Sequence, residues 1–192
     1  IGLGRMGHGM AGRYLENDFT VAVWNRSKAK ADDLIARGAR WAHSPADAAD
    51  GADAIVTMVA DDEASREVWL GKAGAAANAK SGALAIECST VSYSHALQLC
   101  RELHARGLIY LDCPVTGLPD AAASGKLTLL VGAAAPDLDK ARPFLAPLST
   151  TIRHFGAVGS GTVYKLINNL MGAIQIAGIA EGLAIAEQAG LD

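Results

Sequence analysis

The chain has 192 residues, 51% of them hydrophobic, and a formal net charge of −3, which is enough apolar material for one sizeable core and part of a second. Lysine and arginine are scattered and aromatic residues make up only 5%, so we expect no nucleic-acid-binding surface. Three cysteines without C-x-x-C spacing and five dispersed histidines argue against a disulfide framework and a metal site. They fit a reducing compartment, and we expect a cytoplasmic protein.

A glycine-rich loop opens the chain. Gly2, Gly4 and Gly7 form G-x-G-x-x-G, and residues 10–16 are helical in pattern. In this motif the first glycine permits a tight turn, the second lets a pyrophosphate touch the backbone, and the third lets helix and strand pack closely. The N–H groups at the helix start then face the anion. The residues expected to contact a dinucleotide are Gly2, Leu3, Gly4, Arg5, Met6 and Gly7.

The start of the chain bears on this prediction. A strand of several residues should precede such a loop, whereas only Ile1 precedes Gly2. We therefore expect most of the first strand to be missing, and the chain to be a piece of a longer polypeptide.

The residues after the second strand bear on the choice of cofactor. Residues 19–24 are typical of a strand, and Asn25, Arg26 and Ser27 follow in place of the Asp or Glu that usually binds the ribose 2′-hydroxyl of NAD. An arginine can hold a 2′-phosphate bidentately. We therefore predict that these three residues contact NADP, with NAD as a possible cofactor. The alternative is that Arg26 is a solvated turn residue and Asn25 a helix cap.

The next 130 residues alternate between strand and helix patterns. Strands are expected at residues 54–59, 84–87, 108–112, 127–131 and 151–155. Helices are expected at residues 28–37, from Ser44-Pro45, from Asp62 to Leu70, at 92–106 and around 138–144. Residues 113–117 are predicted to form a loop, and 121–125 a flexible stretch. This alternation predicts an α/β fold, a Rossmann-type, mostly parallel sheet with helices on both faces, over residues 1–158.

A glycine-rich joint at residues 156–161 precedes a proline-free span at 162–189. Its apolar part resembles a membrane span, but Gln175, Glu181 and Glu187 interrupt it, so we expect no membrane. A helix that is apolar on most faces is typically buried, here between domains or between subunits. We therefore assign residues 159–192 to a long interdomain helix and expect a homodimer or homotetramer.

Lys165 is the candidate catalytic group on this helix. Asn168 and Asn169 follow it at i+3 and i+4, so Lys165 and Asn169 share a face. Hydride transfer to a carbonyl requires a proton for the developing alkoxide, and a partly desolvated lysine can donate it near neutral pH. The alternative is that Lys165 is an ordinary surface lysine.

Five segments together resemble the signature blocks of the β-hydroxyacid dehydrogenase family. They are I-G-L-G-R-M-G at 1–7, N-R-S at 25–27, E-C-S-T at 87–90, P-V-T-G at 114–117 and G-S-G-T-V-Y-K-L-I-N-N at 159–169. That family includes 3-hydroxyisobutyrate dehydrogenase, tartronate semialdehyde reductase, and glyoxylate and succinic semialdehyde reductases. The resemblance implies that an all-helical C-terminal domain begins with the long helix and is truncated here.

The resemblance also implies residue roles. Lys165 would be the general acid/base with Asn169 beside it, and a small carboxylate-bearing substrate would be the partner. The residues expected to bind that substrate are Ser89, Thr116, Gly117 and Asn168. Those expected along the cofactor are Val59, Ala60 and Thr90.

One departure concerns the substrate. The family commonly has Ser-Gly-Gly where this chain has Thr116, Gly117 and Leu118, and a leucine there reshapes the carboxylate pocket. Nothing indicates the extra phosphate contacts of 6-phosphogluconate dehydrogenase, and imine reductases typically lack the lysine. The sequence thus predicts an NADP-preferring oxidoreductase acting on a small β-hydroxyacid or its semialdehyde or keto form. The alternative is a non-catalytic dinucleotide-binding sensor or scaffold.

Overall fold

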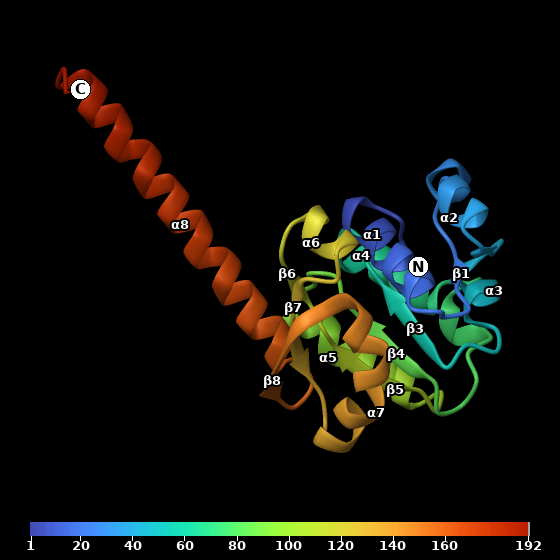
Figure 1. Ribbon diagram of the computed structural model, residues 1–192. Coiled ribbons are helices and arrows are strands. Elements are labelled where there is room, and N and C mark those ends of the chain that lie inside the picture. The colour runs from blue at the N-terminus through green and yellow to red at the C-terminus, as the bar shows by residue number, and fades with distance from the viewer. Residues whose placement is uncertain (192) are drawn as a thin grey trace.

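The computed structural model describes residues 1–191 and has a mostly parallel sheet covered on both faces by helices (Figure 1). Three parallel strands form its centre: β3 (Ala54–Thr57), β4 (Leu84–Glu87) and β5 (Ile109–Asp112). Their registers run from Ala54 opposite Leu84 to Glu87 opposite Asp112. All four residues of β4 are buried, as expected for a strand covered on both faces. The predicted α/β class is confirmed.

The sheet ends in an antiparallel part that the sequence did not predict. After Cys113-Pro114 the chain continues as β6 (Val115–Thr116), and both β5 and β6 pair antiparallel with β7 (Leu127–Gly132) in one continuous register. The prediction of a loop at 113–117 is therefore wrong for these two residues. The stretch predicted to be flexible, 121–125, begins within α6 (Pro119–Ala123), a helix that the sequence did not predict. The last strand, β8 (Ser149–Gly156), runs parallel to β7.

A separate two-stranded parallel sheet lies beyond β3 and consists of β1 (Ala22–Val23) and β2 (Arg40–Trp41). Ile1 and Gly2 connect this pair to β3. The Ile1 amino group donates to Val56 O, Ile1 O accepts from Met58 N, and Gly2 N donates to Trp24 O. The strand predicted at 19–24 exists but is shorter than expected.

The helices form two layers, one on each face. Apolar residues of α1 (Arg5–Glu16), α6 and α7 (Ala135–Leu145) pack with Leu84, Ile86 and Leu111 on one face. On the other face α4 (Asp62–Leu70) and α5 (Tyr93–His104) pack with Ala85 and Tyr110. The remaining helices are shorter: α2 (Asp32–Ala36), α3 (Pro45–Ala49), and the 3₁₀ turns Lys28–Ala31, Ala75–Ala77 and Ala146–Leu148.

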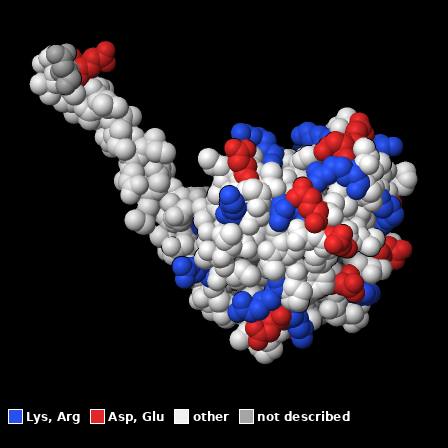
Figure 2. Space-filling model, viewed as in Figure 1, with Lys and Arg blue, Asp and Glu red and all other residues white. Residues whose placement is uncertain are grey.

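The last element, α8 (Ser160–Gln188), is 29 residues long and projects from the β8 side of the body (Figure 1). Its charged residues are Lys165, Glu181 and Glu187, in contrast to the body with its many charged side chains (Figure 2). Most of α8 is exposed among residues 1–191, with Ile176 at 70%, and its burial between domains or between subunits stays a prediction. By length and composition α8 could cross a membrane, although buried helices of soluble proteins pass the same test.

Ser44 caps α3 and offers a test of the local fold. Its side chain accepts the Asp47 N–H at 3.0 Å, whereas Ser27, at the start of the first 3₁₀ turn, makes no capping bond. We expect Ser44→Ala to lower the free energy of unfolding by about 1 kcal/mol. Ser27→Ala, the matched control, should change it by less than about 0.5 kcal/mol. Urea unfolding measures both, and equal effects would contradict the assigned cap.

Candidate functional site

The glycine loop is shaped by close backbone approaches. Gly2 has φ +89°, and a Cβ on it would lie 2.3 Å from Met58 O. A Cβ on Gly7 would lie 1.9 Å from Gly2 O, so α1 can approach the loop only because residue 7 is glycine. A Cβ on Gly4, in contrast, would meet no atom within 4 Å. The space beside the Cα atoms of Gly2 and Gly7 is therefore occupied by other protein atoms, whereas the space beside Gly4 is open.

The N-terminus of α1 faces that open position. Gly4 is its N-cap, so no side chain caps the helix, and the first turn contains no acidic residue. The first N–H groups of a helix have no partner within the helix, and the helix dipole favours an anion there. The uncapped helix start and the open backbone at Gly4 together fit a diphosphate. Arg5 is exposed beside it, Met6 is half-buried, and Leu3 is buried below.

Asn25 has a structural role that the sequence did not reveal. Its Oδ1 accepts the Leu3 N–H at 3.0 Å, and its Nδ2 donates to Ser27 O at 3.1 Å. One side chain thus joins the glycine loop to the end of β1. Arg26 and Ser27 are exposed next to the loop, and Arg26 takes part in none of the ion pairs found among residues 1–191. Its guanidinium is available to an incoming anion.

A buried hydroxyl joins the ends of β3 and β4. Ser89 is 1% exposed, and its Oγ accepts the Val59 N–H at 2.8 Å. The neighbouring Ala60 and Thr90 are exposed. Ser89 therefore holds the loops after β3 and β4 together. Of the two neighbouring hydroxyl groups, Ser89 and Thr90, only that of Thr90 is accessible from the surface.

Glu87 lies beneath these loops and was missed by the sequence reasoning. Its side chain is fully buried, with Oε1 accepting the Ser89 N–H at 2.9 Å. Oε2 accepts from Ser65 Oγ at 2.6 Å and from Trp69 Nε1 at 3.1 Å. Burial of a carboxyl group requires such donors. The only sequence signal was an acid at the end of an otherwise apolar strand, and its donors could not be identified from spacing.

A histidine extends this network toward the surface. His95 Nε2 lies 3.0 Å from Ser65 Oγ, and its Nδ1 lies 3.4 Å from Arg66. Burial lowers the pKa of His95, while the nearby Asp62 acts in the opposite direction. The lowered pKa favours the neutral imidazole, which can hydrogen-bond Ser65 without adding charge to this buried network.

The residues predicted to hold a carboxylate lie where β6 ends. Thr116 is half-buried in β6, and Gly117 has φ +133°, a conformation that favours glycine. Leu118, the departure from the family pattern, is 76% exposed and directly precedes α6. An apolar side chain with this exposure lies on the surface beside Gly117, where it can contact a bound molecule.

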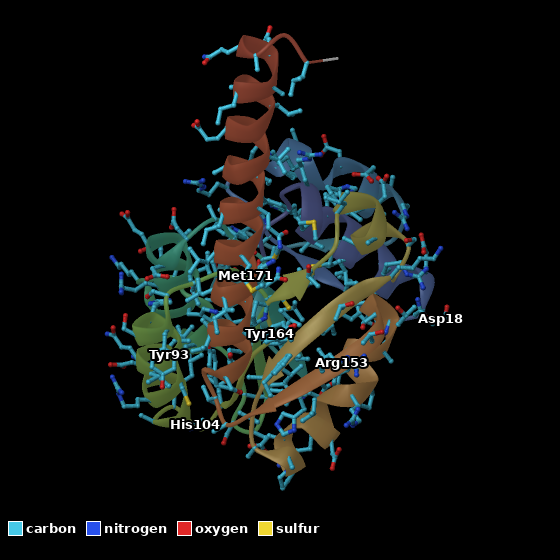
Figure 3. All side chains as sticks on the ribbon, turned by 90° about the vertical axis from the view of Figure 1, so that its left-hand side faces the viewer. Asp18, Tyr93, His104, Arg153, Tyr164 and Met171 are labelled. Atoms are coloured by element: carbon cyan, nitrogen blue, oxygen red, sulfur yellow. The ribbon has the colours of Figure 1, made fainter. Side chains whose placement is uncertain are left out.

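Lys165 lies two turns into α8 and is half-buried, whereas Asn168 and Asn169 are exposed. Burial lowers the pKa of the Lys165 amine below its ordinary value of 10.5. A lowered pKa brings proton transfer by this amine closer to neutral pH. Figure 3 shows α8 rising past the sheet with Tyr164 near its lower end.

Two further features bear on what the site can hold. A cavity of about 530 Å³ lies between β1 and β3, beside Ile1 and against Met10 and Tyr14 of α1. Gly4 is not among the residues that line it, so this cavity is separate from the open position at the start of α1. Among residues 1–191 no group of three or more His, Cys, Asp or Glu side chains is placed to hold a metal ion.

Comparison with known proteins shows the family to which the chain belongs. Residues 1–156 match the family model described as the NAD binding domain of 6-phosphogluconate dehydrogenase. The chain is 36% identical to an NAD-dependent L-serine dehydrogenase of Pseudomonas aeruginosa over 192 residues, which are 100% of this chain and 64% of that protein. Across the most similar curated relatives, the chain spans between 54% and 67% of their length.

Two solved structures share the whole fold. The 3-hydroxyisobutyrate dehydrogenase of Mycobacterium tuberculosis with L-serine superposes with a TM-score of 0.92 at 32% identity, covering 100% of this chain and 65% of that one. Psf3 in complex with NADP+ and 2-OPP has a TM-score of 0.89 at 32% identity, covering 100% of this chain and 68% of that one. The similar proteins thus include one named for NAD and one bound to NADP+.

The contrast between Gly4 and Gly7 gives a test of the loop. Gly7→Ala should lower the free energy of unfolding by about 1–3 kcal/mol, because its methyl group overlaps Gly2 O. Gly4→Ala should cost less than about 1 kcal/mol in stability. It should nevertheless weaken dinucleotide binding at least about tenfold, since the methyl group occupies the open position. Urea unfolding and calorimetric titration separate the two effects. Unchanged dinucleotide affinity in Gly4→Ala would contradict the site.

Proposed function

The chain belongs to the family of NAD-binding domains of 6-phosphogluconate dehydrogenase, and on that premise we propose that it is the cofactor-binding part of an oxidoreductase acting on a small β-hydroxyacid or its semialdehyde or keto form. The observation that carries the proposal is that one chain has both an uncapped helix start at Gly4, suited to a diphosphate, and a half-buried lysine, Lys165, on α8. A non-catalytic dinucleotide binder would need only the first of these features.

The cofactor would be held by the glycine loop and by the ends of β1, β3 and β4. The N–H groups at the start of α1 suit its diphosphate. Arg26 and Ser27 are exposed beside the loop and suit a 2′-phosphate, which supports a preference for NADP over NAD. Val59, Ala60 and Thr90 would lie along the nicotinamide half. When bound, the nicotinamide would supply or accept a hydride.

Lys165 would transfer the proton. During reduction its ammonium form would donate to the oxygen of the carbonyl as negative charge develops there, and during oxidation its neutral amine would accept the hydroxyl proton. The lowered pKa of this lysine supports the assignment, since both forms are then accessible closer to neutral pH. Asn169, four positions further on, would orient the amine or the substrate, with Asn168 beside it.

The substrate carboxylate would bind near the end of β6. The backbone N–H groups around Gly117 and the hydroxyl of Thr116 are suitable donors. Ser89 is buried and its Oγ accepts the Val59 N–H, so it would contribute by holding the neighbouring loop, while its own O–H stays free to donate. Leu118 would set the size of the pocket beside the carboxylate.

The apolar surface of α8 supports a further part of the proposal. Exposed apolar residues such as Leu170 and Ile176 run along the helix. Large exposed apolar patches are typical of interaction sites. We infer that the full protein is a homodimer or homotetramer assembled through this helix, acting in the cytoplasm.

Lys165→Ala tests the catalytic role. In the full-length protein, initial rates with short semialdehydes and 2-keto acids should fall by about 10²- to 10⁴-fold, with NADPH affinity within about twofold of wild type. Lys72→Ala, on an exposed loop lysine, is the control and should retain full activity. Full turnover by Lys165→Ala would show that Lys165 is not the acid/base. No turnover by the wild-type protein would favour the alternative of a non-catalytic sensor or scaffold.

The pH dependence of the wild-type reaction gives a second check. Reduction needs the protonated amine, so its rate should fall as the pH rises through the pKa of Lys165, which burial lowers below 10.5. Oxidation needs the neutral amine and should rise over the same interval. A reduction rate that stays constant up to pH 10.5 would contradict the assignment.

Arg26→Ala tests the cofactor preference. Loss of a bidentate guanidinium–phosphate contact should weaken NADP binding by about 10- to 100-fold. The affinity for NAD, which lacks the 2′-phosphate, should change by less than about twofold, and it serves as the internal control in the same titration. An equal loss for both cofactors would contradict the 2′-phosphate role.

A further inference from the structure

A second buried carboxyl group lies at the end of β5, beside the root of α8. Asp112 has no solvent exposure. Its Oδ1 accepts the Gly159 N–H at 2.6 Å, and its Oδ2 accepts the Thr162 N–H at 2.7 Å. Donors and acceptor are 47 and 50 residues apart in sequence. Both oxygens of one side chain therefore bind the first turn of the helix that carries Lys165.

Three glycines make this contact sterically possible. A Cβ on Gly132 would lie 2.3 Å from Asp112 Oδ1, and one on Gly161 would lie 2.2 Å from Leu130 O. Gly159 adopts φ +95°, and a Cβ there would meet the Tyr93 ring at 2.6 Å. The root of α8 is thus seated against β5, β7 and α5 at distances that only glycine permits. Tyr93 lies at this end of the helix (Figure 3).

Asp112 also supplies what α8 lacks. The N-cap of α8 is Gly159, which has no side chain to bind the free N–H groups of the first turn. The carboxyl group of Asp112 takes that part from a neighbouring strand, at the positive end of the helix dipole. Burial raises the pKa of Asp112, and the N–H bonds from Gly159 and Thr162 act in the opposite direction.

The bond to Thr162 fixes more than the helix start. Lys165 and Asn169 follow Thr162 at i+3 and i+7, so all three lie on one face of α8. Because Thr162 is held at 2.7 Å and is itself buried, the rotation of the helix about its axis is fixed at this point. The direction in which Lys165 points is fixed with it.

We propose that Asp112 is a positioning residue, which sets the orientation and the partial burial of Lys165 by holding the first turn of α8 against β5. This inference rests on the proposed function for the role of Lys165, but the contact itself does not. Desolvation is the cause of the lowered pKa of Lys165, so Asp112 acts on this lysine through placement of the helix and not through its charge.

The test compares Asp112→Asn with Asp139→Asn in the full-length protein. Asp112→Asn has nearly the same volume, but its amide NH₂ must face one of the two N–H donors, so one bond is lost. Asp139→Asn makes the same chemical change at an exposed carboxyl group on α7 and is the matched control. We measure kcat, the Kd of NADPH, and the pH midpoint for labelling of the Lys165 amine by trinitrobenzenesulfonate, mapped by mass spectrometry.

For Asp112→Asn we expect kcat to fall about 10- to 100-fold, the range for misplacement of a catalytic group. The Kd of NADPH should stay within about twofold, because the glycine loop is untouched. The labelling midpoint of Lys165 should move up toward that of an ordinary lysine, as the amine becomes more exposed. Asp139→Asn should match wild type in all three measurements.

A second variant covers the case in which Asp112→Asn does not fold. Thr162→Pro removes the N–H that Oδ2 accepts, at a first-turn position where proline is tolerated. It should shift the same readouts in the same direction, and by more than Thr162→Ala, which removes the side chain but keeps that N–H. An unchanged labelling midpoint in whichever of Asp112→Asn and Thr162→Pro folds would overturn the inference, as would a loss of NADPH affinity as large as the loss in kcat. If wild type turns over none of the substrates, the proposed function fails, and the labelling midpoint still decides the role of Asp112.

Discussion

Two buried carboxyl groups at the ends of neighbouring strands organise the carboxyl edge of this sheet. Glu87 and Asp112 are direct register partners on β4 and β5, and neither is exposed to solvent. A buried carboxyl group without donors would be strongly destabilising, so each must be met by N–H or O–H groups from other elements. Glu87 receives Ser65, Trp69 and Ser89, while Asp112 receives the first turn of α8. The satisfaction of two acids therefore fixes the loops and the helix that carry the site.

Close contacts between main chains also hold the glycine loop and the first turn of α8 in place. At Gly7 against Gly2, and at Gly161 against Leu130, main chains approach so closely that any Cβ would overlap a carbonyl oxygen. Such contacts leave no space for adjustment, because protein interiors are densely packed. Close packing of main chain against main chain therefore holds both the glycine loop and the first turn of α8 in place.

The sequence predicted the parts of the fold that depend on local signals. The strand at 84–87, the helix from Asp62 to Leu70 and the Ser44 cap agree with the structure, since each depends on an apolar run or a capping residue within a few positions. The continuation of β5 into β6 was missed, because Pro114 and Gly117 read locally as a loop, whereas the antiparallel pairing depends on β7. The burial of Ser89 and the partners of Glu87 and Asp112 were missed for the same reason: their donors lie up to 50 residues away.

The exposed length of α8 connects assembly to the chemistry of Lys165. In this structure the amine is only half-buried, yet desolvation already lowers its pKa. Leu166, Ile167 and Leu170 flank it and are between 38% and 60% exposed. An apolar surface that covers these side chains also removes water from around the amine, and desolvation disfavours its charged form. Under such a cover the pKa of Lys165 falls further, so that an apolar interface on α8 would bring the proposed acid closer to neutral pH by the same burial that stabilises the interface.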